Sequence, residues 1–318
     1  MKVAIFARGE LTDDLLRWAT QIGVDCIDDP PIPGMREQGY PDMEKLLKLE
    51  RRVRSWGLRI NRVTLPSTNN FMLGQPGGEE EIDNICKTIK DLGEARIPIG
   101  RPNFITETPP VFSTHSAEHR GGYTMRGFNL DLRKGKLKDA PPDDKITPEE
   151  FWKRCKEIYR NIVPVAEESG VKLALHPSDP PLPEAPFSSL GYHRVLDLFP
   201  SDHNGLLYCV GTRHEAGGTQ LVLDEISNFG RKGKIFEVHF RNVRGNLSTA
   251  GGFEEVLLDD GDMNMFTIIQ ALSNVGFDGA LNPDHMPLLT SDSKDRRMAW
   301  SYSVGYVKAL LAALGTLP

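Results

Sequence analysis

Short apolar segments alternate with longer amphipathic segments along all 318 residues, and this alternation constrains the fold more than any other feature. The apolar segments have the length of β-strands, and the segments between them repeat their apolar residues with helical spacing. We expect strands at residues 3–7, 24–27, 58–63, 97–104, 171–176, 206–210, 235–240 and 279–283. The expected helices cover about 12–22, 43–56, 79–92, 148–168, 192–198, 219–229, 265–275 and 294–314.

Eight strands that alternate with helices are typical of a closed parallel (β/α)₈ barrel, the TIM barrel. A doubly wound open sheet is the competing architecture, because it is built from the same strand–helix units. Barrels reach this length as one unit, so the sequence predicts a single domain over residues 1–318. Residues 106–145 are too many for a plain connection, and we expect an insertion there, either a lid or a surface excursion.

The composition excludes two classes of partner. Hydrophobic residues make up 39% and charged residues 26% of the chain, which is typical of a soluble globular protein. The net charge is −6 and no basic stripe is visible, so no nucleic-acid partner is expected. No apolar run approaches the roughly 20 residues that span a bilayer, and the first apolar stretch is too short for a secretory signal.

The cysteines indicate the compartment. Cys26, Cys86, Cys155 and Cys209 lie far apart without a CxxC pair, and three of them fall in segments expected to be buried. This pattern suits reduced thiols better than a disulfide framework, so we expect a cytoplasmic protein. We also expect a homo-oligomer, a dimer.

Side chains that can bind a metal fall at the ends of the last four expected strands. His176 ends the fifth strand, Cys209 and His239 lie near the ends of the sixth and seventh, and Asp284 follows the eighth. Each alone has a commoner role, as a rim histidine, a core thiol or a turn former. In a barrel, however, these positions share the rim that carries active sites. Two imidazoles, a thiolate and a carboxylate suit a borderline divalent cation better than Mg²⁺ or Ca²⁺.

Five segments surround these residues: LALHPSDPPLP at 173–183, YCVGT at 208–212, VHFRNVRG at 238–245, GDMNM at 261–265 and NPDH at 282–285. In their order and spacing they resemble the mannonate dehydratase family. That family has a xylose-isomerase-like TIM barrel and dehydrates D-mannonate to 2-keto-3-deoxy-D-gluconate with Mn²⁺ or Fe²⁺. The resemblance therefore implies a small-molecule sugar acid as substrate, and Mn²⁺ or Fe²⁺, or another divalent transition metal, as cofactor.

The resemblance also implies roles for residues beside the four metal-binding candidates. Arg241 lies two residues after His239 and therefore on the same strand face, where it could pair with the substrate carboxylate or form a salt bridge inside the barrel. His285 follows Asp284 and could transfer a proton to or from the departing C3 hydroxyl, or orient the ligand. We expect both to be active-site residues.

Three departures from the family pattern affect the surroundings of the site. Met286 stands where the family has glycine, and Leu257 or Leu258 stands where it has histidine. The family's catalytic tyrosine before the last helix has Tyr302 as its nearest counterpart, with a gap of one residue. These changes affect the expected substrate more than the expected metal.

Substrate contacts are expected from two further segments. Asn103 precedes a phenylalanine as in the family's Asn-Phe pair. Arg120 and Tyr123 flank a Gly-Gly pair in the insertion, which either closes over the substrate or forms a surface loop.

The function predicted first is dehydration of D-mannonate. The alternative is a metal-dependent isomerase, epimerase or lyase that acts on another sugar or sugar acid. The third hypothesis is a non-enzymatic metal-binding protein. Such a protein would fill every coordination position of the ion with protein ligands, whereas catalysis needs one open position.

Overall fold

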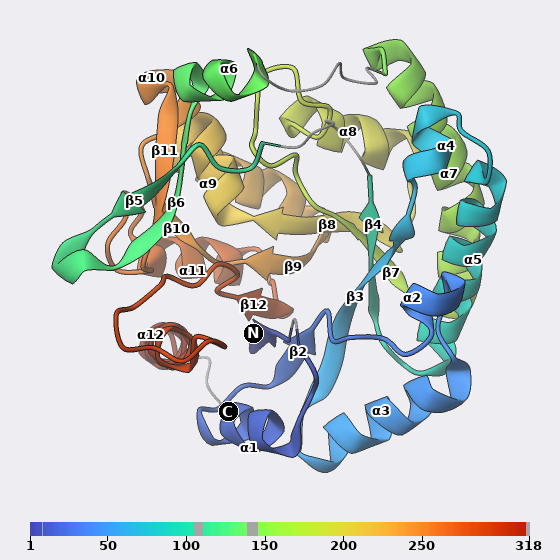
Figure 1. The fold of residues 1–318 in the computed structure, drawn as a ribbon, viewed down its shortest axis with the longest axis horizontal. Helices are drawn as coiled ribbons and strands as arrows, with labels where there is room; N and C mark the ends of the chain where they lie inside the picture. The colour runs from blue at the N-terminus through green and yellow to red at the C-terminus, as the bar shows by residue number, and fades with distance from the viewer. Residues whose placement is uncertain (8, 105–110, 139–145, 316–318) are drawn as a thin grey trace.

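Eight parallel strands close into a barrel in the order β1-β12-β9-β8-β7-β4-β3-β2 (Figure 1). The structure is a computed structural model that describes residues 1–7, 9–104, 111–138 and 146–315. The barrel strands are β1 (Lys2–Phe6), β2 (Cys26–Asp28), β3 (Arg59–Ser67), β4 (Ile99–Asn103), β7 (Lys172–Leu175), β8 (Asn204–Cys209), β9 (Ile235–His239) and β12 (Ala280–Asn282). The predicted (β/α)₈ barrel is confirmed, and the open doubly wound sheet is excluded.

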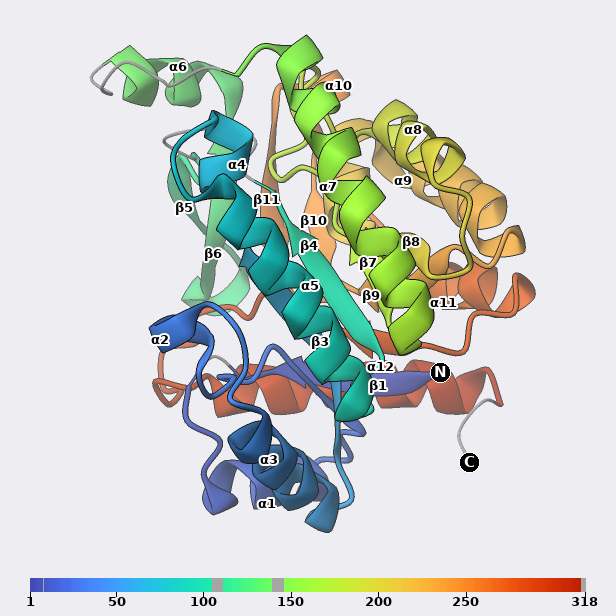
Figure 2. The same cartoon turned by 90° about the vertical axis from the view of Figure 1, so that its right-hand side faces the viewer.

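Helices cover the outside of the barrel, as Figure 2 shows for α5 and α7, which lie side by side. The longer helices are α1 (Asp13–Gln21), α3 (Met43–Ser55), α5 (Gly78–Glu94), α7 (Pro148–Ser169), α8 (Ser189–Leu198), α9 (Val210–Arg231), α11 (Met265–Asn274) and α12 (Arg297–Ala313). The shorter ones are α2 (Met35–Gln38), α4 (Asn69–Leu73), η1 (Arg120–Gly122), α6 (Leu130–Lys138) and α10 (Leu247–Ala250). None of the described helices combines the length and hydrophobicity needed to span a membrane.

The capping residues explain where α7 begins and ends. Thr147 accepts a hydrogen bond from the backbone N–H of Glu150, and Pro148 occupies the first turn, where its missing N–H is not needed. Gly170 ends the helix with a positive φ of 67°. The helix start predicted at Thr147 is therefore confirmed.

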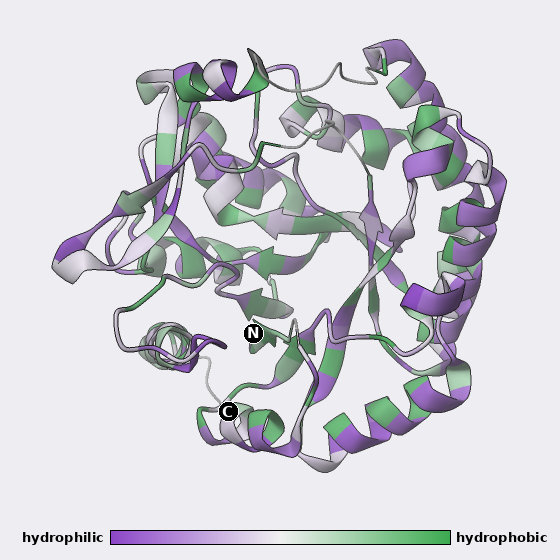
Figure 3. Ribbon diagram, viewed as in Figure 1, coloured by the Kyte–Doolittle hydropathy of each residue, from purple (hydrophilic) through white to green (hydrophobic). Residues whose placement is uncertain are grey.

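Alternate residues of the barrel strands face opposite sides. Leu173 and Leu175 of β7 belong to the large core between barrel and helices, whereas Ala174 packs inside the barrel with Ile99 of β4 and Leu207 of β8. Figure 3 shows this core as hydrophobic strands surrounded by helices with hydrophilic outer faces. The inner apolar layer lies below the mouth of the barrel, so side chains two residues further along each strand reach the mouth.

A second, antiparallel sheet lies beside the barrel and was not predicted. It has the order β10-β11-β6-β5, with β5 (His115–Glu118), β6 (Thr124–Asn129), β10 (Asn242–Arg244) and β11 (Gly252–Val256). The sheet joins the expected insertion to the segment after β9 (Figure 1). Residues 105–110 and 139–145 of that insertion lie outside the described residues. A single domain remains our prediction.

Candidate metal centre

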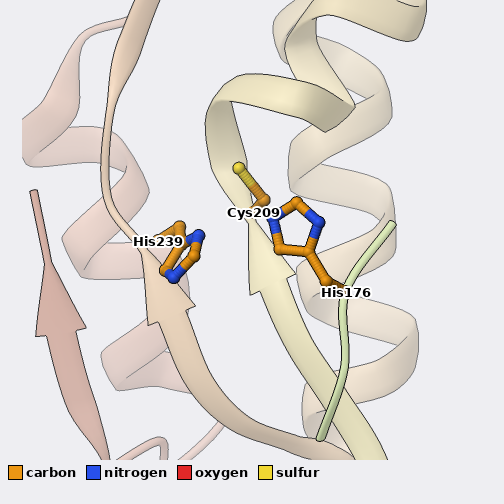
Figure 4. A group of neighbouring side chains, drawn as sticks. All are labelled: His176, Cys209 and His239. Carbon is orange, nitrogen blue, oxygen red and sulfur yellow. The ribbon is translucent and has the colours of Figure 1, made fainter. Parts of the chain in front are cut away.

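Three side chains that can bind a metal converge at the carboxyl end of the barrel. His176 follows β7, Cys209 ends β8 and His239 ends β9, and these strands are neighbours in the sheet. One ligand atom of each residue lies within 4.8 Å of the other two, and Figure 4 shows the three side chains pointing toward one another. They meet because neighbouring parallel strands end at the same rim.

The two imidazoles present nitrogen atoms suited to a metal. His176 Nδ1 lies 2.7 Å from the carbonyl oxygen of Pro177; donating there leaves Nε2 with its lone pair. His239 Nδ1 is buried without a hydrogen-bond partner among the described residues. Burial holds the pKa of both imidazoles well below its usual range, with the Arg101 charge adding to the effect at His176. Both rings are therefore neutral, which is the form that binds a metal.

The sulfur of Cys209 is held by two hydrogen bonds from Thr212. Its Sγ accepts hydrogen bonds from the Thr212 hydroxyl at 3.1 Å and from the Thr212 backbone N–H at 3.4 Å. Burial raises the pKa of the thiol to about 12, although the nearby Arg241 charge opposes the shift. A bound cation would favour loss of this proton. The buried, unpaired His239 nitrogen and this hydrogen-bonded thiol therefore fit a borderline transition metal.

Asp284, the fourth predicted ligand, lies beside these three residues. It follows β12 with a positive φ of 65°, and its backbone N–H donates to Asn282 Oδ1 at 2.8 Å. Its Oδ2 is 3.5 Å from His239 Nδ1 and 3.1 Å from Arg241 Nε. The carboxylate thus adjoins the unpaired nitrogen of His239.

His285 is placed to hold a proton in the same cavity. Its Nδ1 is 2.7 Å from Glu255 Oε1, and its Nε2 is 3.5 Å from Asp284 Oδ2. Burial alone would lower the pKa of the imidazole, but the carboxylates of Asp284 and Glu255 raise it above its usual value. A charged His285 in turn contributes to holding the pKa of Glu255 well below its usual range.

Arg241 is buried in a cluster of acids. Its guanidinium forms salt bridges with Asp179, Glu215, Glu255 and Asp284. It also donates to the Thr212 hydroxyl at 2.7 Å. Burial raises the pKa of the Glu215 carboxyl to about 7, although the Arg241 charge opposes the shift. Of the two roles considered for Arg241, this arrangement matches the salt bridge inside the barrel.

One large cavity opens at the mouth of the barrel. Its volume is about 1900 Å³, and His176, His239, Asp284 and His285 line it. Asn103, expected to contact substrate, also lines the cavity. Further walls come from the second sheet, where β6 contributes residues 124–126.

Three other residues expected at the site are not part of the cavity lining. Arg120 donates to Asp259 at 2.9 Å, and its Nη2 lies 3.4 Å from the hydroxyl of Tyr302. Tyr302 is 42% exposed on α12. The hydroxyl of Tyr123 donates to Asp260 Oδ2 at 2.7 Å and accepts from a backbone N–H. The structure therefore joins Arg120 to Tyr302, and it brings neither of them, nor Tyr123, to the cavity.

Charged residues that were not predicted from the sequence lie next to the metal-binding candidates. Inside the barrel, Arg62 Nη1 is 2.6 Å from Asp29 Oδ2, and its Nε is 2.9 Å from Glu237 Oε2. Arg62 Nη2 lies 3.5 Å from His239 Nε2, so this network borders the metal-binding candidates. Burial raises the pKa of Glu237 well above its usual value. A signal was available, because these charges stand inside segments with strand character.

Other missed residues had weaker signals. Asp179 and Thr212 belong to the HPSDPP and YCVGT motifs, so the motifs pointed to them. Glu255 and Arg126, which form a salt bridge at 2.8 Å, come from β11 and β6. The contact between these two residues depends on the second sheet, which no periodicity in the sequence predicts.

Comparison with known proteins gives consistent matches. The family model described as D-mannonate dehydratase (UxuA) matches residues 124–316. A mannonate dehydratase of Streptococcus pneumoniae (strain 70585) is 29% identical, over 88% of this chain and 86% of that protein. The crystal structure of mannonate dehydratase from Streptococcus suis serotype 2 superposes with a TM-score of 0.83 at 25% identity, and covers 100% of this chain and 97% of that one. A xylose isomerase domain protein from Planctomyces limnophilus, 10% identical with a TM-score of 0.63, shares the fold.

Proposed function

The chain belongs to the D-mannonate dehydratase (UxuA) family of hydro-lyases, and on this premise we propose that it removes water from D-mannonate to give 2-keto-3-deoxy-D-gluconate. The observation that carries the proposal is the convergence of His176, Cys209 and His239 at the cavity that His285 also lines. Metal-binding groups and a proton-holding imidazole at one barrel mouth are what an elimination next to a carboxylate requires.

Four residues would hold the cofactor in this proposal. His176, Cys209, His239 and Asp284 would bind one divalent transition metal, Mn²⁺ or Fe²⁺. The neutral imidazoles, the unpaired His239 nitrogen and the hydrogen bonds to the Cys209 sulfur support the assignment. When bound, such a cation stabilises the negative charge that develops on the substrate carboxylate as the C2 proton leaves.

His285 supplies the proton for the leaving group. As a base in the cavity accepts the C2 proton, the electron pair of the C2–H bond forms the C2–C3 double bond, and the C3–O bond breaks with its electrons on oxygen. The departing hydroxyl takes a proton from the His285 imidazolium and leaves as water, and the resulting enol becomes the 2-keto acid. The C2 proton returns through the solvent to His285 after the reaction, so the net loss is one water. The contacts of His285 with Glu255 and Asp284 support this role, because both carboxylates favour the charged imidazole.

The remaining proposals concern the whole protein. All four cysteines are free, which supports the cytoplasmic location proposed from the sequence. We retain the homo-oligomer, a dimer, and the single domain as proposals from the sequence.

The test is an assay of the purified protein with Mn²⁺ and D-mannonate. We expect a product that has lost one water and reacts as a 2-keto-3-deoxy acid, with activity abolished by a chelator and restored by Mn²⁺. The same assay includes other aldonates, aldoses and ketoses. Turnover of one of these without turnover of D-mannonate would replace the dehydratase by the alternative isomerase, epimerase or lyase.

A further inference from the structure

Arg101 is a partly buried cation that forms no salt bridge with any acid of the described residues. It lies on β4 and lines the cavity with His176, His239 and Asp284. Its Nε is fully enclosed without a hydrogen-bond partner, and no acid of the described residues forms a salt bridge with it. A buried charge without a counter-ion is costly, so such a side chain is expected where a ligand supplies the missing anion.

Two other arginines that line the cavity have acid partners, and the remaining Lys and Arg residues of its lining, Lys136, Lys294 and Arg296, are exposed to solvent. Arg126 forms salt bridges with Asp179 and Glu255, and Arg297 with Asp14 and Asp295. Arg62, one strand away from Arg101, has Asp29 and Glu237. Asp29 also lines the cavity, but its two carboxylate oxygens are already bonded to Arg62 and Thr64. The charges of Asp29, Asp284 and Glu237 act on Arg101, but no acid of the described residues forms a salt bridge with it.

The barrel topology places Arg101 opposite the proton-holding histidine. Ile99 packs inside the barrel, and Arg101, two residues further along β4, continues the same face. In the closed strand order, β9, β8 and β7 separate β12 from β4 on one side, and β1, β2 and β3 separate them on the other. β4 is thus diametrically opposite β12, after which His285 follows. The metal-binding candidates on β7, β8 and β9 lie along the arc between Arg101 and His285.

We propose that Arg101 binds the carboxylate of the sugar acid and thereby fixes the direction in which the substrate crosses the barrel mouth. The carboxylate lies between Arg101 and the metal-binding residues, the C2–C3 bond lies beside those residues, and the C3 hydroxyl points to His285. The guanidinium suits this task because it can donate two parallel hydrogen bonds to a carboxylate. This inference rests on the proposed function and deepens it, because it makes a negative charge at C1 the requirement for binding.

Arg101 and Arg241 have different roles in this proposal. Arg241, for which a substrate carboxylate was considered, already has four protein carboxylates and does not line the cavity. Arg101 has none and does line it. Burial and the neighbouring Arg62 lower the pKa of Arg101, which agrees with a cation that lacks a counter-ion, although an arginine remains charged at neutral pH. Arg241 is then a positioning residue for Asp284, and Arg101 is the substrate anchor.

The test compares Arg101→Met and Arg101→Lys with Arg297→Met, which removes a cavity arginine that already has two carboxylate partners. Steady-state kinetics of the Mn²⁺-loaded enzyme on D-mannonate give KM and kcat. Chelator-treated protein gives the shift in Tm caused by D-mannonate, by other aldonates and by the neutral alditol D-mannitol, without turnover. The Tm of each variant without ligand reports on folding.

We expect Arg101→Met to raise KM about 10- to 100-fold, with a smaller loss of kcat, because charged hydrogen bonds to the carboxylate are lost. Its Tm shift with D-mannonate should fall to that with D-mannitol, and Arg101→Lys should recover part of both. The Tm without ligand should stay equal or rise, since an unpaired charge is removed. Arg297→Met should keep the KM and the ligand shift of the wild type.

Failure of this inference can be told apart from failure of the proposed function. Unchanged KM and ligand shift in Arg101→Met, in an enzyme that dehydrates D-mannonate, overturn the anchor and leave the function standing. A lower Tm of Arg101→Met without ligand, with the shift by D-mannonate intact, would assign Arg101 a structural role instead. If the wild type turns over no D-mannonate but aldonates raise its Tm only when Arg101 is present, the anchor stands and the reaction is another one. Absence of any aldonate shift in the wild type also overturns the anchor.

Discussion

The two halves of the barrel mouth suit ligands of opposite charge. In the C-terminal half, β7, β8 and β9 carry His176, Cys209 and His239, whose environments favour the neutral imidazoles and the protonated thiol. In the N-terminal half, β3 and β4 carry Arg62 and Arg101, which are charged. The side chains of the C-terminal half therefore suit coordination of a cation. The arginine charge of the N-terminal half suits an anion as its partner.

Within the N-terminal half, two arginines on adjacent strands differ in their partners. Arg62 is fully buried and bonded to Asp29 and Glu237, whereas Arg101 has no carboxylate partner among the described residues. A paired buried charge contributes to the stability of the fold, because its removal leaves the partner charges buried without a counter-ion. An unpaired one contributes to binding because its partner comes from outside. Pairing, more than burial or residue type, therefore separates a structural arginine from a functional one.

The largest effect is expected in the C-terminal half, from Cys209→Ala. Loss of the thiol should remove most of the bound transition metal, because loss of a supporting residue alone lowers metal affinity roughly 10- to 100-fold and loss of a ligand lowers it further. Elemental analysis after dialysis measures the metal. Cys86→Ala, on α5 outside the site, is the control and should retain it. Unchanged metal content in Cys209→Ala would contradict the metal-binding role assigned to the C-terminal half.

A smaller effect is expected in the N-terminal half, from Arg62→Met. It leaves Asp29 and Glu237 without their cation, so the free energy of unfolding should fall by about 3–5 kcal/mol, measured by urea denaturation. The matched control is Arg52→Met, which breaks the exposed salt bridge with Asp13 and should cost about 0–1 kcal/mol. Equal losses in the two variants would contradict the structural role assigned to Arg62.

The smallest effect is expected from Tyr302→Phe. The hydroxyl lies near Arg120 at the exposed side of α12 and does not line the cavity, so kcat/KM on D-mannonate should change less than about twofold. Steady-state kinetics of the variant beside the wild type provide the measurement. A loss of 100-fold or more would return Tyr302 to the catalytic role expected from the sequence, and would require that α12 bring this side chain to the cavity in the working enzyme.

The barrel and the residues at the ends of its last four strands could be predicted from local sequence patterns. Strand periodicity and length are local properties, and parallel neighbouring strands end at the same rim, so His176, Cys209 and His239 could be expected together before any contact was known. The start of α7 at Thr147 was equally local, because the cap and its partner lie three residues apart.

Which charges are paired depends on the tertiary structure. Arg62 and Glu237 are 175 residues apart in sequence and meet only when the barrel closes. The pairing of β6 with β11 brings Arg126 to Glu255 in the same way, and Glu255 also contacts His285. Tertiary structure also joined Tyr302 to Arg120 outside the cavity lining. It surrounded Arg241 with acids, whereas Arg101 forms no salt bridge within the described part of the chain. A charge's partners depend on strands that are distant along the chain, and no local pattern encodes them.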